Sequence, residues 1–334
     1  MTANTRTPAT GAVSLRDVQA PVADALARVT DEMWRIVAVD SATFQGVNQH
    51  LMLMQGKMLR PLLLLLSSEV DGTPEPRAAS YAAVVELIHL ATLVHDDAVD
   101  HSVLRRGMPT INSLFTHQVA VIAGDFLYSR AVQELVRLGD LEPLRVLAKA
   151  SNELTMGEMR QLSALDALAF SEADYEFLIR AKTAALFSAS TEVGALCGAA
   201  RFRADLARYG SLFGMAFQVI DDLLDYTEAS ETLGKPAGLD LREHKVTLPL
   251  IAALRQMPPA SRQAVDELFA NPEPTDEQIA RVIEIVDEEG GLDYARRRVE
   301  TYASQAEDAL GALPESPARQ ALADAITYVM ARRS

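Results

Sequence analysis

The chain has 334 residues, of which 49% are hydrophobic, so it is long and apolar enough to bury a large core. Its formal net charge of −15 argues against nucleic acid as a partner. The single cysteine, Cys197, excludes a disulfide bridge within the chain.

Residues 1–13 are small and mostly polar, and we expect them to form a disordered tail. No linker, low-complexity tract or repeat divides residues 14–334, which are predicted to form one all-α domain. The densest apolar run, Leu59–Leu66, is too short to span a bilayer. We therefore expect a cytoplasmic protein without a transmembrane segment.

Alanine and leucine dominate, and the alternation typical of strands is nearly absent. Two stretches, Tyr81–Val94 and Ser211–Ile220, are apolar nearly all round, which predicts that they lie inside a bundle. Periodicity and Gly/Pro breaks predict helices at about Ser14–Ala38, Phe44–Gln49, Leu59–Val70, Arg77–Asp97, Ile111–Leu138, Leu141–Leu165, Glu172–Thr191, Ala204–Tyr226, Thr247–Gln256, Ser261–Ala270, Asp276–Glu288 and Gly291–Arg332, the last with a break near Pro314.

Two identical Asp-Asp-x-x-Asp motifs end the apolar helices predicted to lie in the core. They consist of Asp96, Asp97 and Asp100, and of Asp221, Asp222 and Asp225. Positions i and i+4 share a helix face, so the first and last aspartates of each motif lie one turn apart. Gathered carboxylates are costly unless a cation compensates them, and Mg²⁺ prefers oxygen ligands shared with substrate phosphates. Two acidic surface helix ends are the alternative, but two identical motifs favour a metal–diphosphate site.

Basic residues fall in segments suited to phosphate binding. Lys57 and Arg60 begin a predicted helix and share a face, and a helix N-terminus favours anions. Arg105 and Arg106 follow the first aspartate motif, where they could bind phosphate or pair with its carboxylates. Lysines and small polar residues occur in three further segments, at Lys182-Thr183, at Gln218 and in the loop from Lys235 to Lys245.

Taken together, these segments resemble the trans-polyprenyl diphosphate synthases, the head-to-tail isoprenyl diphosphate synthases. The resemblance spans roughly residues 50–255 in the family's order. It is carried by Gly56–Pro61, His89 with Ala91–Asp100, Arg105-Arg106, Gly124-Asp125-Phe126, Gly157–Gln161, Lys182-Thr183, Phe213–Asp225, Gly234–Asp240 and Lys245–Leu250.

The resemblance implies a bundle of about a dozen helices around a deep central cavity, usually in a homodimer. It implies a Mg²⁺-dependent condensation of isopentenyl diphosphate with an allylic diphosphate. Three Mg²⁺ ions, two at the first aspartate motif and one at the second, would bridge the allylic diphosphate. That diphosphate would also contact Arg105, Lys182, Thr183, Gln218, Lys235 and Lys245. Isopentenyl diphosphate would contact Lys57, Arg60, His89 and Arg106, and catalysis would rest on Asp96, Asp97, Asp100, Lys182, Asp221 and Asp222.

The residues one turn before Asp96 are Ala91 and Thr92, both small. A growing tail that runs back along this helix would meet no aromatic side chain there. We therefore predict a product longer than geranylgeranyl diphosphate. A shorter-chain synthase, making geranylgeranyl or farnesyl diphosphate, remains the alternative.

Three other interpretations share parts of this pattern. A terpene cyclase or a head-to-head synthase would carry one aspartate cluster, and the second motif and Gly56–Pro61 argue against both. A non-catalytic partner subunit of a heteromeric synthase would typically lose aspartates or basic residues, all of which this chain keeps.

Overall fold

The computed structural model describes residues 13–54, 56–72, 74–162, 167–227 and 237–332, which are helical almost throughout. This confirms the predicted all-α class. Most of the expected N-terminal tail and Lys235 lie outside the described residues.

The first half of the chain forms a series of helices, with one short β-hairpin between α5 and α6. Its elements are α1 (Leu15–Gln19), α2 (Ala23–Val37), α3 (Ala42–Leu53), α4 (Leu59–Glu69), α5 (Ala78–Val99), β1 (Leu104–Arg105), β2 (Met108–Pro109), α6 (Ile111–Leu114), α7 (His117–Leu138) and α8 (Leu141–Leu162).

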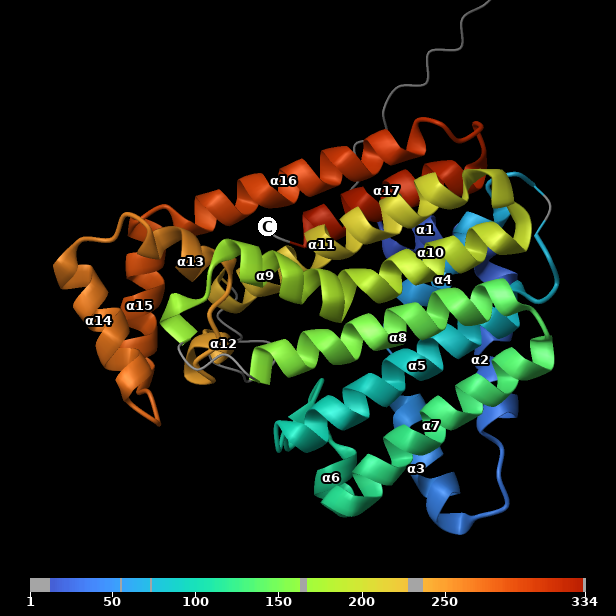
Figure 1. Ribbon diagram of the computed structural model, residues 1–334, viewed down its shortest axis with the longest axis horizontal. Coiled ribbons are helices and arrows are strands. Elements are labelled where there is room, and N and C mark those ends of the chain that lie inside the picture. The colour runs from blue at the N-terminus through green and yellow to red at the C-terminus, as the bar shows by residue number, and fades with distance from the viewer. Residues whose placement is uncertain (1–12, 55, 73, 163–166, 228–236, 333–334) are drawn as a thin grey trace, which may run out of the picture.

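The second half continues the bundle and adds a small group of helices at one end (Figure 1). Its elements are α9 (Glu172–Ile179), α10 (Ala185–Gly198), α11 (Arg203–Thr227), α12 (Leu239–Arg242), α13 (Leu248–Leu254), α14 (Pro259–Ala270), α15 (Asp276–Glu288), α16 (Gly291–Leu310) and α17 (Pro317–Ala331).

Three predicted helices are interrupted. The helix expected over Ser14–Ala38 is broken by a 3₁₀ turn, Ala20–Val22, because Pro21 lacks a backbone donor. The helix expected over Ile111–Leu138 breaks after α6. The helix expected over Glu172–Thr191 changes to a π-helical segment at Arg180–Ala184 before α10 begins.

The β-hairpin was not predicted. Leu104 pairs with Pro109, and Arg105 pairs with Met108. Its turn residues, Arg106 (φ 52°) and Gly107 (φ 75°), both adopt positive φ, as in the tight turns that suit a hairpin. The hairpin holds Arg105 and Arg106 directly after α5.

Helix α5 is the core helix of the bundle. Its mean hydropathy over 18 residues is 1.4, and it is the one helix of the described chain long and apolar enough to cross a membrane. Because 72% of that window is buried inside the protein, packing against neighbouring helices accounts for its apolar composition. This is the interior position that the sequence predicted for Tyr81–Val94.

The C-terminal ends of α5, α8 and α11 point toward the same end of the bundle, beside α12 (Figure 1). Both aspartate motifs stand on such ends, at the end of α5 and near the end of α11. The fold therefore brings together two motifs that lie more than a hundred residues apart in the chain.

Candidate functional site

The first aspartate motif divides between two environments. Asp97 is buried, and both of its oxygens accept from Arg105 Nε at 2.9 and 2.8 Å. The carboxylates of Asp96 and Asp100 form no hydrogen bond or ion pair within the described part of the chain, although the backbone nitrogen of Asp100 donates to the backbone oxygen of Asp96 at 2.8 Å. Burial raises the pKa of Asp96 to about 6, opposed by Lys182 and reinforced by Glu158 and Asp100. Asp96 is thus a carboxylate whose charge is only partly compensated.

Lys182 lies between the first motif and α8. Its Nζ contacts Glu158 Oε1 at 2.5 Å and donates to Gln161 Oε1 at 3.1 Å, and it lies within electrostatic reach of Asp96. Lys182 sits in the π-helical segment, a feature that often marks functional sites. Helix α8 can pack closely against the π-helical segment because Gly157 has no side chain. A Cβ at Gly157 would lie 2.7 Å from Ala181 Cβ.

The second motif is held by hydrogen bonds from three elements. Asp222 accepts from Tyr175 Oη at 2.5 Å on one oxygen and from Gln218 Nε2 at 2.9 Å on the other. Thr183 donates to Gln218 Oε1 at 2.6 Å, so Thr183, Gln218 and Asp222 form one chain. Asp221 instead pairs with Arg332, near the end of the chain, at 3.0 Å.

The third aspartate of this motif binds the start of α12. The oxygens of Asp225 accept from the backbone nitrogens of Leu239 and Asp240 at 3.1 and 3.0 Å. Asp240 thereby comes close to both Asp222 and Asp225. Burial and the neighbouring carboxylates raise the pKa of Asp222 to about 7 and that of Asp240 to about 8. Lys245 opposes the rise for Asp240 only in part, so the charge of this group of carboxylates is incompletely compensated.

Lys245 links the two motifs electrostatically. Burial disfavours its charge, but a hydrogen bond with Glu243 and the carboxylates Asp100 and Asp240 outweigh this and raise the pKa of Lys245. Asp100 belongs to the first motif, and Asp240 stands beside the second. Lys245 therefore lies within electrostatic reach of the first motif and of the carboxylate beside the second.

The residues predicted to bind isopentenyl diphosphate form a basic cluster around His89. His89 lies close to Arg60, Arg106 and Arg105; burial lowers its pKa well below the usual value, and the three arginines lower it further. Arg106 Nη1 donates to the backbone oxygen of Met54 at 2.8 Å. Gly56 leaves room for Arg106, because a Cβ there would lie 2.4 Å from Arg106 Nη1.

Arg60 is short of polar partners. Its Nε is buried and has no hydrogen-bond acceptor among the described residues, while its guanidinium stacks over Phe187 at 4.4 Å. Burial lowers the pKa of Arg60 to about 10, although Glu86 and Asp221 oppose this. Lys57 lies over the ring of Tyr328 at 5.2 Å, within electrostatic reach of Asp221. An anionic ligand would satisfy this cluster.

The two candidate chain-length residues lie on α5 as expected from the sequence. Ala91 is buried, and the hydroxyl of Thr92 donates to the backbone oxygen of His89 at 2.7 Å. Further along α5, Tyr81 is buried, and its hydroxyl has no hydrogen-bond partner in the described structure.

No group of three or more His, Cys, Asp or Glu side chains among the described residues is arranged to hold a metal ion by itself. Two of the six motif aspartates are instead paired with arginines, Asp97 with Arg105 and Asp221 with Arg332.

Sequence reasoning missed several members of the site. Tyr175 and Arg332 reach the second motif from distant parts of the chain, and no local pattern marks them. Glu158, Gln161 and Asp240 lie in segments that carry the family resemblance, which gave them no individual role. Glu86 lies three residues before His89 on the same core helix, so the two share a face. This spacing was a signal that Glu86 lies near the cluster around His89.

Comparison with known proteins identifies the family. A model described as polyprenyl synthetase matches residues 41–286. The chain is 40% identical over 309 residues to the all-trans-nonaprenyl-diphosphate synthase (geranyl-diphosphate specific) of Rhodobacter capsulatus, covering 92% of this chain and 94% of that protein. It is 39% identical over 269 residues to the octaprenyl diphosphate synthase of Escherichia coli, covering 80% and 83%.

A solved structure agrees with these sequence relatives. The polyprenyl synthase of Caulobacter crescentus, complexed with calcium and isoprenyl diphosphate, aligns with a TM-score of 0.91 and 34% identity, covering 98% of this chain and 100% of that one. Family model, relatives and fold agree with the paired aspartate motifs described above. This chain therefore belongs to the polyprenyl synthetase family and is a prenyl diphosphate synthase.

Proposed function

We propose that this enzyme condenses isopentenyl diphosphate with an allylic diphosphate, in a Mg²⁺-dependent reaction, to give a polyprenyl diphosphate longer than geranylgeranyl diphosphate. The observation that carries the proposal is that two aspartate motifs lie on neighbouring helix ends (Figure 1), with Lys182 within electrostatic reach of Asp96 and Lys245 within reach of Asp100 and Asp240. The relatives named as nonaprenyl and octaprenyl diphosphate synthases support it.

The carboxylates around this space fit a divalent cation. Asp96, Asp222 and Asp240 have raised pKa values because they are buried near other carboxylates. Hard oxygen donors with uncompensated charge are the ligands that Mg²⁺ prefers. The six motif aspartates would hold the metal, with three ions in the arrangement that the family resemblance implies. When bound, Mg²⁺ would supply positive charge that stabilises the departing diphosphate.

The basic residues of the site would take the allylic diphosphate. Lys182 already lies beside Asp96, and Lys245 lies within reach of Asp100. Thr183 and Gln218 are joined by a hydrogen bond next to Asp222 and could turn toward phosphate oxygens. Fixed positive charge aimed at the leaving group favours cleavage of the allylic C–O bond, which leaves an allylic cation and pyrophosphate.

Isopentenyl diphosphate would bind in the cluster of Lys57, Arg60, His89 and Arg106. The unpartnered Arg60 Nε supports this role, because it offers a buried donor without an acceptor. The double bond of isopentenyl diphosphate attacks the allylic cation and forms the new C–C bond. Loss of a proton then restores a double bond, and the released pyrophosphate is the acceptor that we propose for this proton. The apolar walls of the bundle would keep water from the cation.

The growing tail would extend along α5. Ala91 and Thr92, one turn before Asp96, leave no aromatic barrier next to the site. The apolar, buried face of α5 continues beyond them and suits a hydrocarbon chain. A product longer than geranylgeranyl diphosphate follows from this arrangement.

We further propose that the enzyme acts as a homodimer. A group of apolar residues on the hairpin, α6 and the start of α7, here called the α7 patch, is exposed: Val103, Leu104, Leu114, Phe115, Val121 and Ile122. Monomeric proteins rarely leave contiguous apolar surface of this kind uncovered. A second copy of the chain would cover it.

The decisive experiment is product analysis of the purified chain alone. It is incubated with Mg²⁺, labelled isopentenyl diphosphate and a series of allylic diphosphates, and products are measured by mass spectrometry. We expect label in a polyprenyl diphosphate longer than geranylgeranyl diphosphate. Product that ends at geranylgeranyl or farnesyl diphosphate would establish the shorter-chain alternative, and absence of product from the chain alone would favour a partner subunit.

A further inference from the structure

Helix α9 lies beside the second aspartate motif and delivers one buried tyrosine to it. The side chain of Tyr175 is 2% exposed, and its hydroxyl donates to Asp222 Oδ2 at 2.5 Å. Gln218 Nε2 donates to the other oxygen, Oδ1, at 2.9 Å. Each oxygen of Asp222 therefore holds one protein donor and keeps a further lone pair free.

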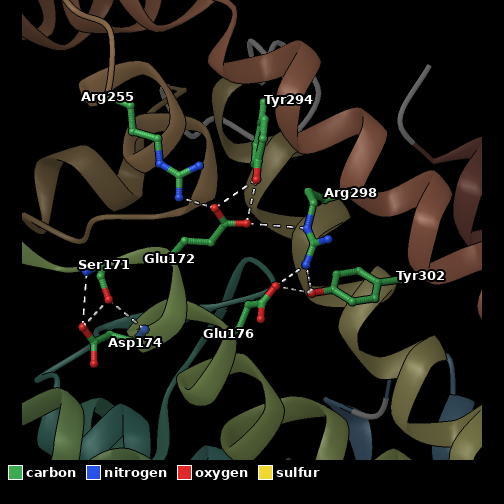
Figure 2. A network of polar contacts seen from close by, with 8 residues as sticks. All are labelled: Ser171, Glu172, Asp174, Glu176, Arg255, Tyr294, Arg298 and Tyr302. Carbon is green, nitrogen blue, oxygen red and sulfur yellow. Dashed lines mark hydrogen bonds and ion pairs between the residues drawn. The ribbon is translucent and has the colours of Figure 1, made fainter.

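Helix α9 is also fixed to the C-terminal helices by a dense polar network, here called the α9 clamp (Figure 2). Tyr294 Oη donates to both oxygens of Glu172 at 2.8 and 2.9 Å, and Arg255 pairs with the same carboxylate. Arg298 forms ion pairs with both acidic residues: its Nε lies 3.6 Å from Glu172 Oε1, and its Nη2 pairs with Glu176 Oε1. Its members are Glu172, Glu176, Arg255, Tyr294, Arg298 and Tyr302.

The clamp and the tyrosine are parts of one short helix. Glu172 and Glu176 lie one turn apart, so they anchor α9 along its length, and Tyr175 lies between them in sequence. A capping box at Ser171 and Asp174 fixes the start of the helix, with Ser171 Oγ donating to Asp174 Oδ2 at 2.6 Å. The position of the Tyr175 hydroxyl is therefore set by contacts that reach α13 and α16.

We propose that Tyr175 is a positioning residue for Asp222, and that the α9 clamp sets where Tyr175 delivers its hydrogen bond. This inference rests on the proposed function, in which Asp222 is a ligand of Mg²⁺. A carboxylate with one donor on each oxygen cannot rotate freely, so its remaining lone pairs keep a fixed direction. Hydrogen bonds behind metal ligands commonly change metal affinity about 10- to 100-fold when they are removed.

A purely structural hydrogen bond is the competing explanation, and the chain offers a matched control for it. Tyr209, on α11, is also fully buried, and its hydroxyl donates to the backbone oxygen of Leu322 at 2.8 Å. Tyr175→Phe and Tyr209→Phe each remove one buried hydroxyl and one hydrogen bond. Only the first of them touches a motif aspartate.

The test follows the melting temperature of the protein as Mg²⁺ is added in the presence of inorganic pyrophosphate. The measured quantity is the Mg²⁺ concentration that gives half of the full rise in melting temperature. We expect Tyr175→Phe to need about 10-fold more Mg²⁺ than the wild type, and Tyr209→Phe to match the wild type. The same shift should appear in the Mg²⁺ dependence of product formation. Tyr175→Phe with the Mg²⁺ dependence of the wild type would overturn the inference and leave the proposed function intact.

A wild-type protein that Mg²⁺ and pyrophosphate do not stabilise would overturn both, because Asp222 would then not be a metal ligand. Should Tyr175→Phe fail to fold, Arg298→Lys provides an independent arm. It weakens the α9 clamp without touching Asp222, and we expect a smaller rise in the Mg²⁺ requirement. An unchanged requirement in folded Arg298→Lys would overturn the role of the clamp.

Discussion

At the scale of single residues, His89 makes the stability of the protein depend on pH. Burial, followed by Arg60, Arg106 and Arg105, lowers its pKa well below the usual value. In the unfolded chain, His89 would take up a proton near its ordinary pKa of about 6.5. Below that pH, the unfolded state therefore binds more protons than the folded state. The contribution of His89 to the free energy of unfolding is complete above about pH 6.5 and is lost as pH falls.

We predict that His89→Gln removes the part of the acid-induced loss of stability that comes from protonation of His89. The free energy of unfolding of the ligand-free wild type, measured in urea from pH 7.5 to 5, should fall more steeply than that of His89→Gln. The difference between the two proteins should change by up to about 1.4 kcal/mol per pH unit below pH 6. A difference that stays constant over this range would contradict the prediction.

Ala91 should determine how far the product grows. Ala91→Phe would place an aromatic ring one turn before Asp96, where the tail is expected to pass. We predict a shorter main product by mass spectrometry, with the first condensation retained. Because Ala91 is only 2% exposed, the variant should also lose about 1–3 kcal/mol of stability through overpacking. A folded Ala91→Phe that makes product of unchanged length would remove the proposed path along α5.

At the scale of helices, the π-helical segment and its neighbours set the position of Lys182. A Cβ at Gly157 would lie 2.7 Å from Ala181 Cβ and 3.5 Å from Lys182 Cγ. We predict that Gly157→Ala costs about 1–3 kcal/mol in unfolding free energy and lowers the rate of product formation by displacing Lys182. Chemical unfolding and initial rates on the same samples test both effects.

The matched control is Gly46→Ala, on α3. A Cβ there would meet only Phe115 Cζ at 3.9 Å, an ordinary contact. This variant should leave the rate unchanged and gain up to about 1 kcal/mol, because alanine favours a helix over glycine. Equal losses in Gly46→Ala and Gly157→Ala would show that close packing at Gly157 is not the cause.

The same helices show what a sequence can predict. No Gly or Pro interrupts Glu172–Thr191, so the sequence predicted one helix there and gave no sign of the change to π-helix at Arg180–Ala184. The family resemblance, and no local spacing, implied that Arg60, His89 and Arg106 would share a ligand, and His89 does lie close to both arginines. The contact of Tyr175 with Asp222 joins residues 47 apart and depends on how α9 packs, which no local pattern encodes.

At the scale of the whole molecule, the α7 patch gathers several exposed apolar side chains from the hairpin, α6 and α7. Ile122 is 55% exposed there, although the side chain is large and apolar. We predict that Ile122→Arg converts a homodimer into a monomer, because it places a charge in the apolar interface without disturbing the core. Sedimentation velocity or light scattering measures the change in mass.

Leu141→Arg is the matched control for this prediction. Leu141 is 70% exposed and begins α8, at the opposite end of the α7–α8 pair from Ile122. The same substitution there should leave the mass of the particle unchanged, whereas a general effect of added charge would alter both variants alike. A wild-type protein that sediments as a monomer would exclude the homodimer, and a dimeric Ile122→Arg would move the interface away from the α7 patch.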